Sequence, residues 1–403
     1  MINMKVLTVF IDGLKPESIE DMPFLNRFNR RRIKTELGYS NPCHASMYSG
    51  VNPNKHLVWF IWKYSPETSP FNWIKRTKFD KFPNNIYIKY FLYRITKLFY
   101  KNNTSAFGLP FLWYMPLNKW FYFDVAEKKF WTERNFLEGH PTIFEILRNA
   151  CIDYEVIGLS KNALNNSVEC IKNHNFKKFA SWTYIFIGDI DPLSHQYGQS
   201  SPEVREKLNE IDNILLNIYR KFKNESDDFC FMLFSDHGHT LAYDKVNLSL
   251  VFMSNGSVLE DYIYFVDSNY ARFWFRNEKE RLTVTNVLSN LNDKGFILTD
   301  NILKQYKVDM PDRRYGDLIF YLDSPYTFDQ GNIFVMGKER SDTGKYISFH
   351  GYLPDRLDSD GVFISNRDMI DDPYIRLEDI MPSILSLFKV NVPKDIDGTL
   401  IWK

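Results

Sequence analysis

Short, continuously apolar segments recur along this chain and alternate with amphipathic helical segments. The clearest, residues 6–11, is rich in β-branched residues and suits a strand buried on both faces, as in a parallel sheet. Further strands are expected near 154–158, 183–187 and 229–235, with helices over 142–150 and 203–223. This alternation predicts an α/β fold: a three-layer core whose central sheet is largely parallel and flanked by helices.

Two segments interrupt the alternation. Residues 58–135 are especially aromatic, in a chain that is 17% Phe, Trp and Tyr overall, and we expect a helical cap insertion there. Residues 256–345 mix expected strands with a helix and predict a small α+β insertion. The core domain would then consist of three parts, 1–57, 136–255 and 346–403, which a chain of 403 residues can accommodate.

Within the aromatic insertion, residues 86–101 are expected to form a helix. Lys89, Tyr93, Lys97 and Lys101 fall on one stripe, and apolar residues cover the rest of the surface. Most helices of this kind pack against the main body. A broad apolar face with a basic stripe would also suit a membrane surface or an amphiphilic substrate, so the sequence leaves peripheral membrane contact open.

Composition excludes several classes of function. The 50 basic residues balance the 50 acidic ones, so we expect no nucleic-acid polymer as a partner. The sequence has no run of about 20 apolar residues, so we expect no transmembrane segment. The four cysteines lack metal-binding spacing and are expected to be buried thiols of a reducing compartment, so a cytoplasmic location is the default expectation. They are Cys43, Cys151, Cys170 and Cys230.

Ser40 lies where an expected strand gives way to an expected helix. Residues 32–37 are predicted as the strand, Pro42 favours a first helical turn, and Gly50 would end the helix. The Ser40 hydroxyl would then lie beside the free backbone N–H groups of a helix N-terminus, a place that suits a phosphate group. A helix-capping serine is the simpler alternative.

Carboxylate and imidazole side chains follow three of the expected strands. Together with one histidine near the C-terminal part, the candidate ligands are Asp12, Asp191, His195, Asp236, His237 and His350. Because the carboxyl ends of parallel strands converge, we expect these side chains to meet. The mixture of oxygen and nitrogen ligands suits zinc or another divalent first-row metal. Two such cations about 4 Å apart are suited to phosphoryl transfer.

In combination and order, these motifs resemble the alkaline phosphatase superfamily, specifically its type I phosphodiesterase and nucleotide pyrophosphatase branch. The segments that carry the resemblance are 9–14, 40–50 with Pro53 and His56, 191–198, 235–238, 350–352, and 378–383 with Asp397-Gly398. The resemblance implies that one metal is held by Asp191, His195 and His350, and another by Asp12, Asp236 and His237 with Ser40 touching it. Zinc is the expected metal and manganese the alternative.

The resemblance further implies a hydrolase of phosphodiester or pyrophosphate bonds in which Ser40 is the nucleophile and a phosphoseryl intermediate forms. The alternative is a transferase that moves a substituted phosphate onto a glycan or lipid, and the aromatic insertion would suit an amphiphilic or glycan-linked substrate. A phosphomonoesterase is less favoured because no arginine adjoins Ser40, and a non-catalytic binding protein is less favoured because every expected ligand is present. A sulfatase is disfavoured because Cys43 is not followed by the proline and arginine that sulfatases require.

Several residues around these ligands have weaker assignments. The candidate substrate contacts are Asn41, which adjoins Ser40, and Trp59 and Phe60, which occupy the neighbourhood where nucleotide pyrophosphatases have an asparagine. We expect His44 to serve in helix packing. Asp189 and His239 are candidates for positioning the metal ligands.

Overall fold

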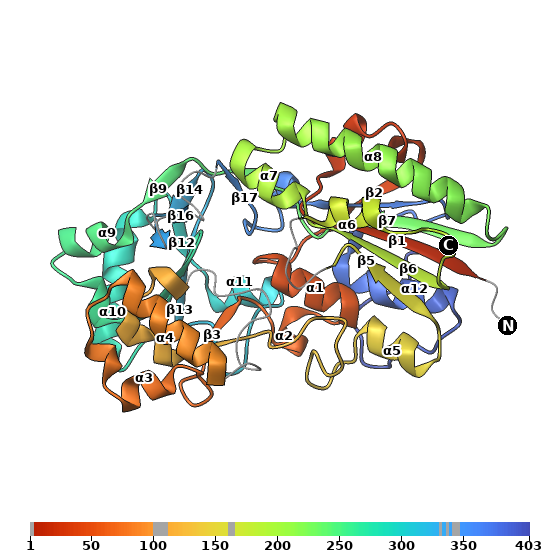
Figure 1. Cartoon of the computed structure of the whole chain (residues 1–403). Helices are drawn as coiled ribbons and strands as arrows, with labels where there is room; N and C mark the ends of the chain where they lie inside the picture. The colour runs from red at the N-terminus through yellow and green to blue at the C-terminus, as the bar shows by residue number, and fades with distance from the viewer. Residues whose placement is uncertain (1–3, 100–111, 160–165, 330–332, 336–337, 341–346) are drawn as a thin grey trace. The chain divides into compact units, whose positions relative to one another are not determined.

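The computed structural model describes residues 4–99, 112–159, 166–329, 333–335, 338–340 and 347–403 (Figure 1). The chain divides into two compact units. The first consists of Met1–His56, Trp131–Leu241 and Ile347–Lys403, and the second of Leu57–Phe130 and Ala242–Tyr346. Both insertions predicted from the sequence fall in the second unit. The second chain segment of that unit begins at Ala242, before the expected residue 256, because Leu248 and Phe252 pack in the hydrophobic cluster of the unit.

A seven-stranded sheet with the order β19-β2-β18-β7-β1-β6-β5 forms the centre of the first unit. Its strands are β1 (Lys5–Ile11), β2 (Asn29–Lys34), β5 (Tyr154–Ile157), β6 (Trp182–Ile187), β7 (Phe229–Phe234), β18 (Gly361–Ser365) and β19 (Tyr374–Arg376). Neighbouring strands run parallel except at β18, which is antiparallel to both β7 and β2. The predicted α/β class with a largely parallel central sheet is therefore confirmed.

Helices cover both faces of this sheet (Figure 1). They are α1 (Ser40–Ser49), α2 (Pro53–His56), α5 (Ile143–Asn149), α6 (Ser167–Asn173), α7 (Ile190–Tyr197), α8 (Pro202–Lys223) and α12 (Ile380–Leu387). On one side of β1, Val9 belongs to the same hydrophobic cluster as Leu208 of α8. On the other side, the ring of Phe10 packs edge-on against His44 of α1 at 5.3 Å. Alternate residues of β1 thus face two helical layers, which explains why this strand is apolar throughout.

The segment around Ser40 differs slightly from expectation. Strand β2 covers Asn29–Lys34 and not residues 32–37. Its three arginines pair with β18 while remaining partly or fully exposed, so the strand lacks the apolar pattern by which its start could be recognised. Helix α1 begins at Ser40 and ends at Gly50, whose φ of +71° is the left-handed geometry expected of a terminating glycine.

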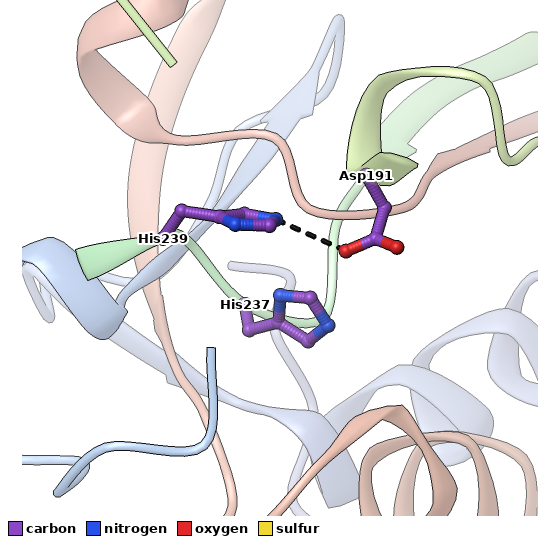
Figure 2. Close-up of side chains that lie close together, drawn as sticks. All are labelled: Asp191, His237 and His239. Atoms are coloured by element: carbon purple, nitrogen blue, oxygen red, sulfur yellow. Dashed lines mark hydrogen bonds and ion pairs between the residues drawn. The ribbon is translucent and has the colours of Figure 1, made fainter. Parts of the chain in front are cut away.

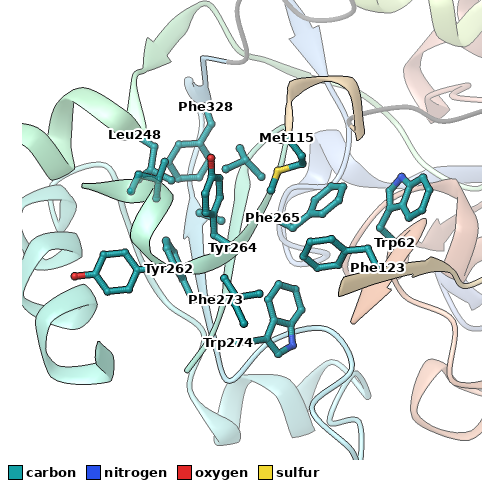
Figure 3. Close-up of a cluster of buried hydrophobic side chains, with 14 of the residues drawn as sticks. Trp62, Met115, Phe123, Leu248, Tyr262, Tyr264, Phe265, Phe273, Trp274 and Phe328 are labelled. Atoms are coloured by element: carbon teal, nitrogen blue, oxygen red, sulfur yellow. The ribbon is translucent and has the colours of Figure 1, made fainter. Parts of the chain in front are cut away.

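The second unit contains a four-stranded antiparallel sheet with the order β10-β11-β13-β12. The described strands of the whole unit, of which four form this sheet, are β3 (Trp62–Tyr64), β4 (Phe123–Val125), β9 (Asp244–Val246), β10 (Ile263–Asp267), β11 (Tyr270–Trp274), β12 (Gly295–Ile297), β13 (Leu318–Leu322), β14 (Tyr326–Phe328), β15 (Ile333–Val335) and β16 (Lys338–Arg340). Its helices are α3 (Asn72–Arg76), α4 (Ile86–Phe99), α9 (Leu248–Ser254), α10 (Glu278–Leu288) and α11 (Asp300–Gln305). Residues of both chain segments share one aromatic-rich core (Figure 3).

A fully buried arginine lies within this second unit. The Arg272 guanidinium donates a hydrogen bond from Nη1 to the carbonyl of Trp62 at 2.8 Å and lies 2.5 Å from Asp267 Oδ2. It also stacks over the ring of Phe60, 4.3 Å from its centroid. Burial raises the pKa of Asp267 to about 6, although the charge of Arg272 opposes that rise. Arg272 and Asp267 both belong to the second chain segment, and the contacts of Arg272 with Trp62 and Phe60 join it to the first segment of the unit.

Three further expectations can be compared with the structure. Cys43 and Cys230 are buried as expected, but Cys151 and Cys170 are exposed, so the prediction of buried thiols is wrong for those two. Lys89 is buried, whereas its place in a basic stripe suggested an outward side chain, and Lys101 lies outside the described residues. In the described part of the chain, no helix is both long enough and apolar enough to span a bilayer.

Two short strands complete the first unit. They are β8 (Thr240–Leu241) and β17 (Ser348–Phe349), which pair in antiparallel register. β8 directly follows His239, and β17 directly precedes His350. This pairing brings the C-terminal part of the chain to the carboxyl end of β7.

Candidate metal centre

The candidate ligands come from the carboxyl ends of three neighbouring strands. Asp12 follows β1, and its backbone N–H donates to the carbonyl of Ile187 at the end of β6 at 2.9 Å. Asp236 and His237 follow β7. Helix α7, which carries Asp191, begins at Ile190, shortly after the end of β6 at Ile187. Parallel pairing of β7, β1 and β6 aligns these ends, so residues far apart in sequence meet at one edge of the sheet.

Asp191, His195 and His350 form one group of possible metal ligands. Asp191 and His195 are one turn apart on α7, and His195 Nε2 lies 3.4 Å from Asp191 Oδ1. His350 Nε2 lies 3.5 Å from the same oxygen. His195 Nδ1 is 2.8 Å from the carbonyl of Ser348, to which only a protonated Nδ1 can donate. That hydrogen bond leaves the Nε2 lone pair directed at Asp191, as a metal ligand requires.

Asp12, Asp236 and His237 form a second group. His237 Nε2 lies 3.6 Å from Asp12 Oδ1 and 3.2 Å from Asp236 Oδ2. His237 Nδ1 is 3.1 Å from the carbonyl of Gly238 and donates to it, so Nε2 again carries the lone pair. The two groups contain the same members that the family resemblance assigns to the two metals.

Ser40 lies beside the second group. It is the first residue of α1, and its Oγ is 3.0 Å from His237 Nε2. The neighbouring Asn41 is partly buried on the same turn. The other two candidate substrate contacts, Trp59 and Phe60, belong to the second unit, where both are buried and both rings pack against Tyr315. Their assignment as substrate contacts remains a prediction.

The electrostatics of this edge fit a binding site for cations. Burial raises the pKa of Asp12 well above its ordinary value, and the charges of Asp236 and Asp191 raise it further. Burial also raises the pKa of Asp236. Burial alone would raise the pKa of Asp191 as well, but His195 and other neighbouring imidazoles outweigh it and hold that pKa well below its usual range. Crowded carboxylates of this kind are stabilised by divalent cations.

Unsatisfied polar atoms lead to the same conclusion. Among the described residues, Asp12 Oδ1, Asp236 Oδ2 and His350 Nδ1 are buried and take part in no hydrogen bond. Buried polar atoms usually have a partner, and a missing one commonly indicates an ion. Carboxylate oxygens and imidazole nitrogens in this number suit zinc or manganese. The residues present therefore fit the two cations that the sequence predicts, although they do not identify the metal.

His239 lies within the centre, next to Asp191 of the first group (Figure 2). Its Nε2 is 3.0 Å from Asp191 Oδ1, and its Nδ1 is 3.3 Å from Ser348 Oγ. Gly13 permits this placement, because a Cβ atom there would lie 2.9 Å from His239 Nε2. The expectation that His239 positions a ligand fits this geometry. His239 also combines with Asp191 and His237 as a third possible ligand group, overlapping the other two.

Asp189 has a different role from the one expected. Its Oδ2 accepts hydrogen bonds from the backbone N–H groups of Ser167 and Val168, both at 3.1 Å, at the start of α6. It therefore holds that helix and does not position a metal ligand. Sequence reasoning also missed Ser348, whose carbonyl and hydroxyl contact His195 and His239. The only available signal was its place two residues before His350.

A buried polar network supports the other end of α1. Ser46 Oγ donates to Glu36 Oε1 at 2.9 Å and lies 3.1 Å from His56 Nε2. Burial lowers the pKa of His56 to about 3, so the imidazole is neutral and its Nε2–H can donate to Ser46. Burial, followed by the charge of Glu378, raises the pKa of Glu36 to about 8. The network anchors the helix whose first residue is Ser40.

The arrangement of ligands, helix terminus and serine defines an enzyme class, the metal-dependent phosphoric ester hydrolases. The sequence model of the type I phosphodiesterase/nucleotide pyrophosphatase family matches residues 6–353, and the chain belongs to that family. A search of curated protein sequences finds no match.

Solved structures show the same fold. Murine ectonucleotide pyrophosphatase/phosphodiesterase 5, as an inactive variant in complex with AMP, superimposes with a TM-score of 0.67 at 13% identity, covering 98% of this chain and 97% of that one. The human enzyme of the same name gives a TM-score of 0.65 at 13% identity with the same coverage. At this identity the likeness establishes the fold of the whole chain and not its substrate.

Proposed function

We propose that this protein cleaves phosphodiester or pyrophosphate bonds with Ser40 as the nucleophile. Asp191, His195 and His350 would hold one divalent cation, and the group around His237 would hold the other. The observation that carries the proposal is the position of Ser40 Oγ, 3.0 Å from His237 Nε2 at the edge where both ligand groups meet. A serine that only capped a helix would have no reason to face this cluster.

The reaction would proceed in two displacements at phosphorus. Bound divalent cations would supply Lewis acidity and neutralise the charge of the phosphate. Ser40 Oγ bonds to phosphorus as the bond to the leaving-group oxygen breaks, and the proton of Ser40 ends on the departing oxygen, which gives a phosphoseryl ester. Water then attacks phosphorus, the bond to Ser40 Oγ breaks, and a proton of that water returns to Ser40 Oγ. Free backbone N–H groups in the first turn of α1 favour the anionic group throughout.

The likeness to a phosphodiesterase solved with AMP supports a nucleotide or another substituted phosphate as the group that is transferred. A hydrolysis panel should therefore contain diesters, monoesters and nucleotide pyrophosphates, each with zinc, manganese and magnesium. We expect diesters or pyrophosphates to be cleaved faster than monoesters. Product analysis with and without an added alcohol acceptor would separate hydrolysis from transfer to a glycan or lipid.

Replacement of the nucleophile gives the most direct test. Ser40→Ala should abolish turnover while the bound metal persists, as measured by elemental analysis. Ser49→Ala is a matched control in the same helix, because Ser49 Oγ is buried and donates to the carbonyl of Ala45 at 2.6 Å. A chiral phosphorothioate substrate should show net retention of configuration, since two inversions occur. Net inversion would exclude the covalent route.

A further inference from the structure

Helix α4 of the second unit exposes a row of large apolar residues. Tyr87, Phe91 and Leu98 follow one another along one face and are 66%, 61% and 66% exposed. The opposite face, which is buried, includes Lys89, Leu92 and Thr96. An ordinary surface helix directs its apolar stripe to the core and its polar residues outward, whereas α4 has apolar residues on its outer face and two polar residues on its inner face.

Hydrogen bonds to the inward residues fix this orientation. Lys89 Nζ donates to the carbonyl of Trp113 at 2.8 Å, and Thr96 Oγ1 accepts from the indole Nε1 of Trp73 at 2.9 Å. A rotation of α4 that buried Phe91 would break both hydrogen bonds and strand buried polar groups. The outward apolar face is therefore a built feature of the unit.

Basic residues are also concentrated in this part of the chain. Residues 72–99 contain seven basic side chains and one acidic side chain, in a protein whose overall charge is zero, and all of the basic ones except the buried Lys89 remain partly or fully exposed. Arg94 lies within the outward stripe, between Phe91 and Leu98, and Lys97 lies at its side. We call this surface the α4 patch. It comprises the exposed residues Phe82, Tyr87, Phe91, Arg94, Lys97, Leu98 and Phe99.

We propose that the α4 patch binds the surface of an anionic phospholipid bilayer. Exposed aromatic and aliphatic side chains would enter the region between the headgroups and acyl chains, while Arg94 and Lys97 pair with lipid phosphates. A second copy of the chain suits the patch less well, because two such faces would bring like charges together. The proposal does not depend on the chemistry of the metal centre.

Flotation with lipid vesicles tests the proposal in the full-length protein. We expect binding to vesicles of equal parts phosphatidylcholine and phosphatidylglycerol, little binding to phosphatidylcholine alone, and weaker binding at high salt. Arg94→Gln and Lys97→Gln should each weaken binding about fivefold. The combined Phe91→Gln and Leu98→Gln variant should weaken it by about tenfold or more, since it removes two apolar side chains that would enter the bilayer.

Matched controls come from exposed residues elsewhere. Leu250→Gln and Met253→Gln remove exposed apolar side chains of α9 in the same unit, and Lys221→Gln removes an exposed charge of α8. These variants should bind as the unaltered protein does, and hydrolysis of a soluble diester should be unchanged in every variant. Three results would overturn the proposal: no binding to anionic vesicles, equal losses in the control variants, or a dimer in solution that the patch substitutions dissociate.

Discussion

Glu36→Gln should make the protein more stable at alkaline pH, although it alters a hydrogen-bonded residue beneath α1. Burial and the nearby charge of Glu378 raise the pKa of Glu36 from 4.5 to about 8. The folded protein therefore holds this carboxyl in its neutral form at neutral pH, whereas the unfolded chain ionises it. Glutamine keeps an oxygen that can accept from Ser46 Oγ and has no charge to lose.

The expected size follows from the pKa shift. A rise of about 3.5 pH units corresponds to at most about 5 kcal/mol. The Glu36 side chain is only partly buried, so solvent screening reduces this value. We therefore expect Glu36→Gln to raise the free energy of unfolding by about 2–3 kcal/mol at alkaline pH. The sign is that of an acid whose pKa is raised on folding. The contribution of Glu36 to stability is complete below pH 4.5 and is lost as the pH rises through about 8.

Urea unfolding of the metal-free protein, followed by circular dichroism at several pH values, would measure this effect. The free energy of unfolding of Glu36→Gln minus that of the unaltered protein should be near zero at about pH 4.5. It should grow to a plateau above pH 8. Glu206→Gln, on the exposed face of α8, is the control and should show no such growth. A difference that stays constant with pH would refute the reasoning, because Glu36 would then be ionised in the fold.

Two further substitutions test other parts of the structure. Gly13→Ala places a Cβ at a φ of +71° and 2.9 Å from His239 Nε2. It should lower the free energy of unfolding by about 1–2 kcal/mol in urea and weaken zinc binding about tenfold in a competition titration. Unchanged zinc affinity would speak against the role of His239. Arg272→Met leaves Asp267 buried without its partner and should lower the free energy of unfolding by about 3–5 kcal/mol. The double variant with Asp267→Asn should regain part of that loss. A loss below about 1 kcal/mol for Arg272→Met would contradict a buried ion pair.

Local patterns were sufficient to predict the parallel core and to bring the candidate ligands to its edge. The apolar run of β1 ends in Asp12, and that of β7 ends in Asp236, so each ligand lies next to the signal that predicts its strand. Asp191 and His195 are four residues apart, and one helical turn places them together whatever surrounds them. These inferences needed only periodicity and the rule that parallel strand ends converge.

Features that depend on distant partners could not be predicted. The inward polar residues of α4 are paired with Trp73 and Trp113, which lie outside the helix, so the local sequence gave no signal that Lys89 would point inward. Asp189 follows β6 as a ligand might, but its oxygen is taken by the backbone of α6. Likewise, nothing in the local sequence shows that two segments separated by more than 100 residues share the core around Arg272.

The position of β1 in the middle of the sheet has a consequence for synthesis. Among the strands of this sheet it is synthesised first, yet both of its neighbours, β6 and β7, come more than 170 residues later. At roughly 5–20 residues per second, β6 and β7 follow β1 only after about 10–45 seconds. During that interval an apolar nascent strand has no partner in the sheet, so we expect the growing chain to need a chaperone until β6 and β7 have emerged.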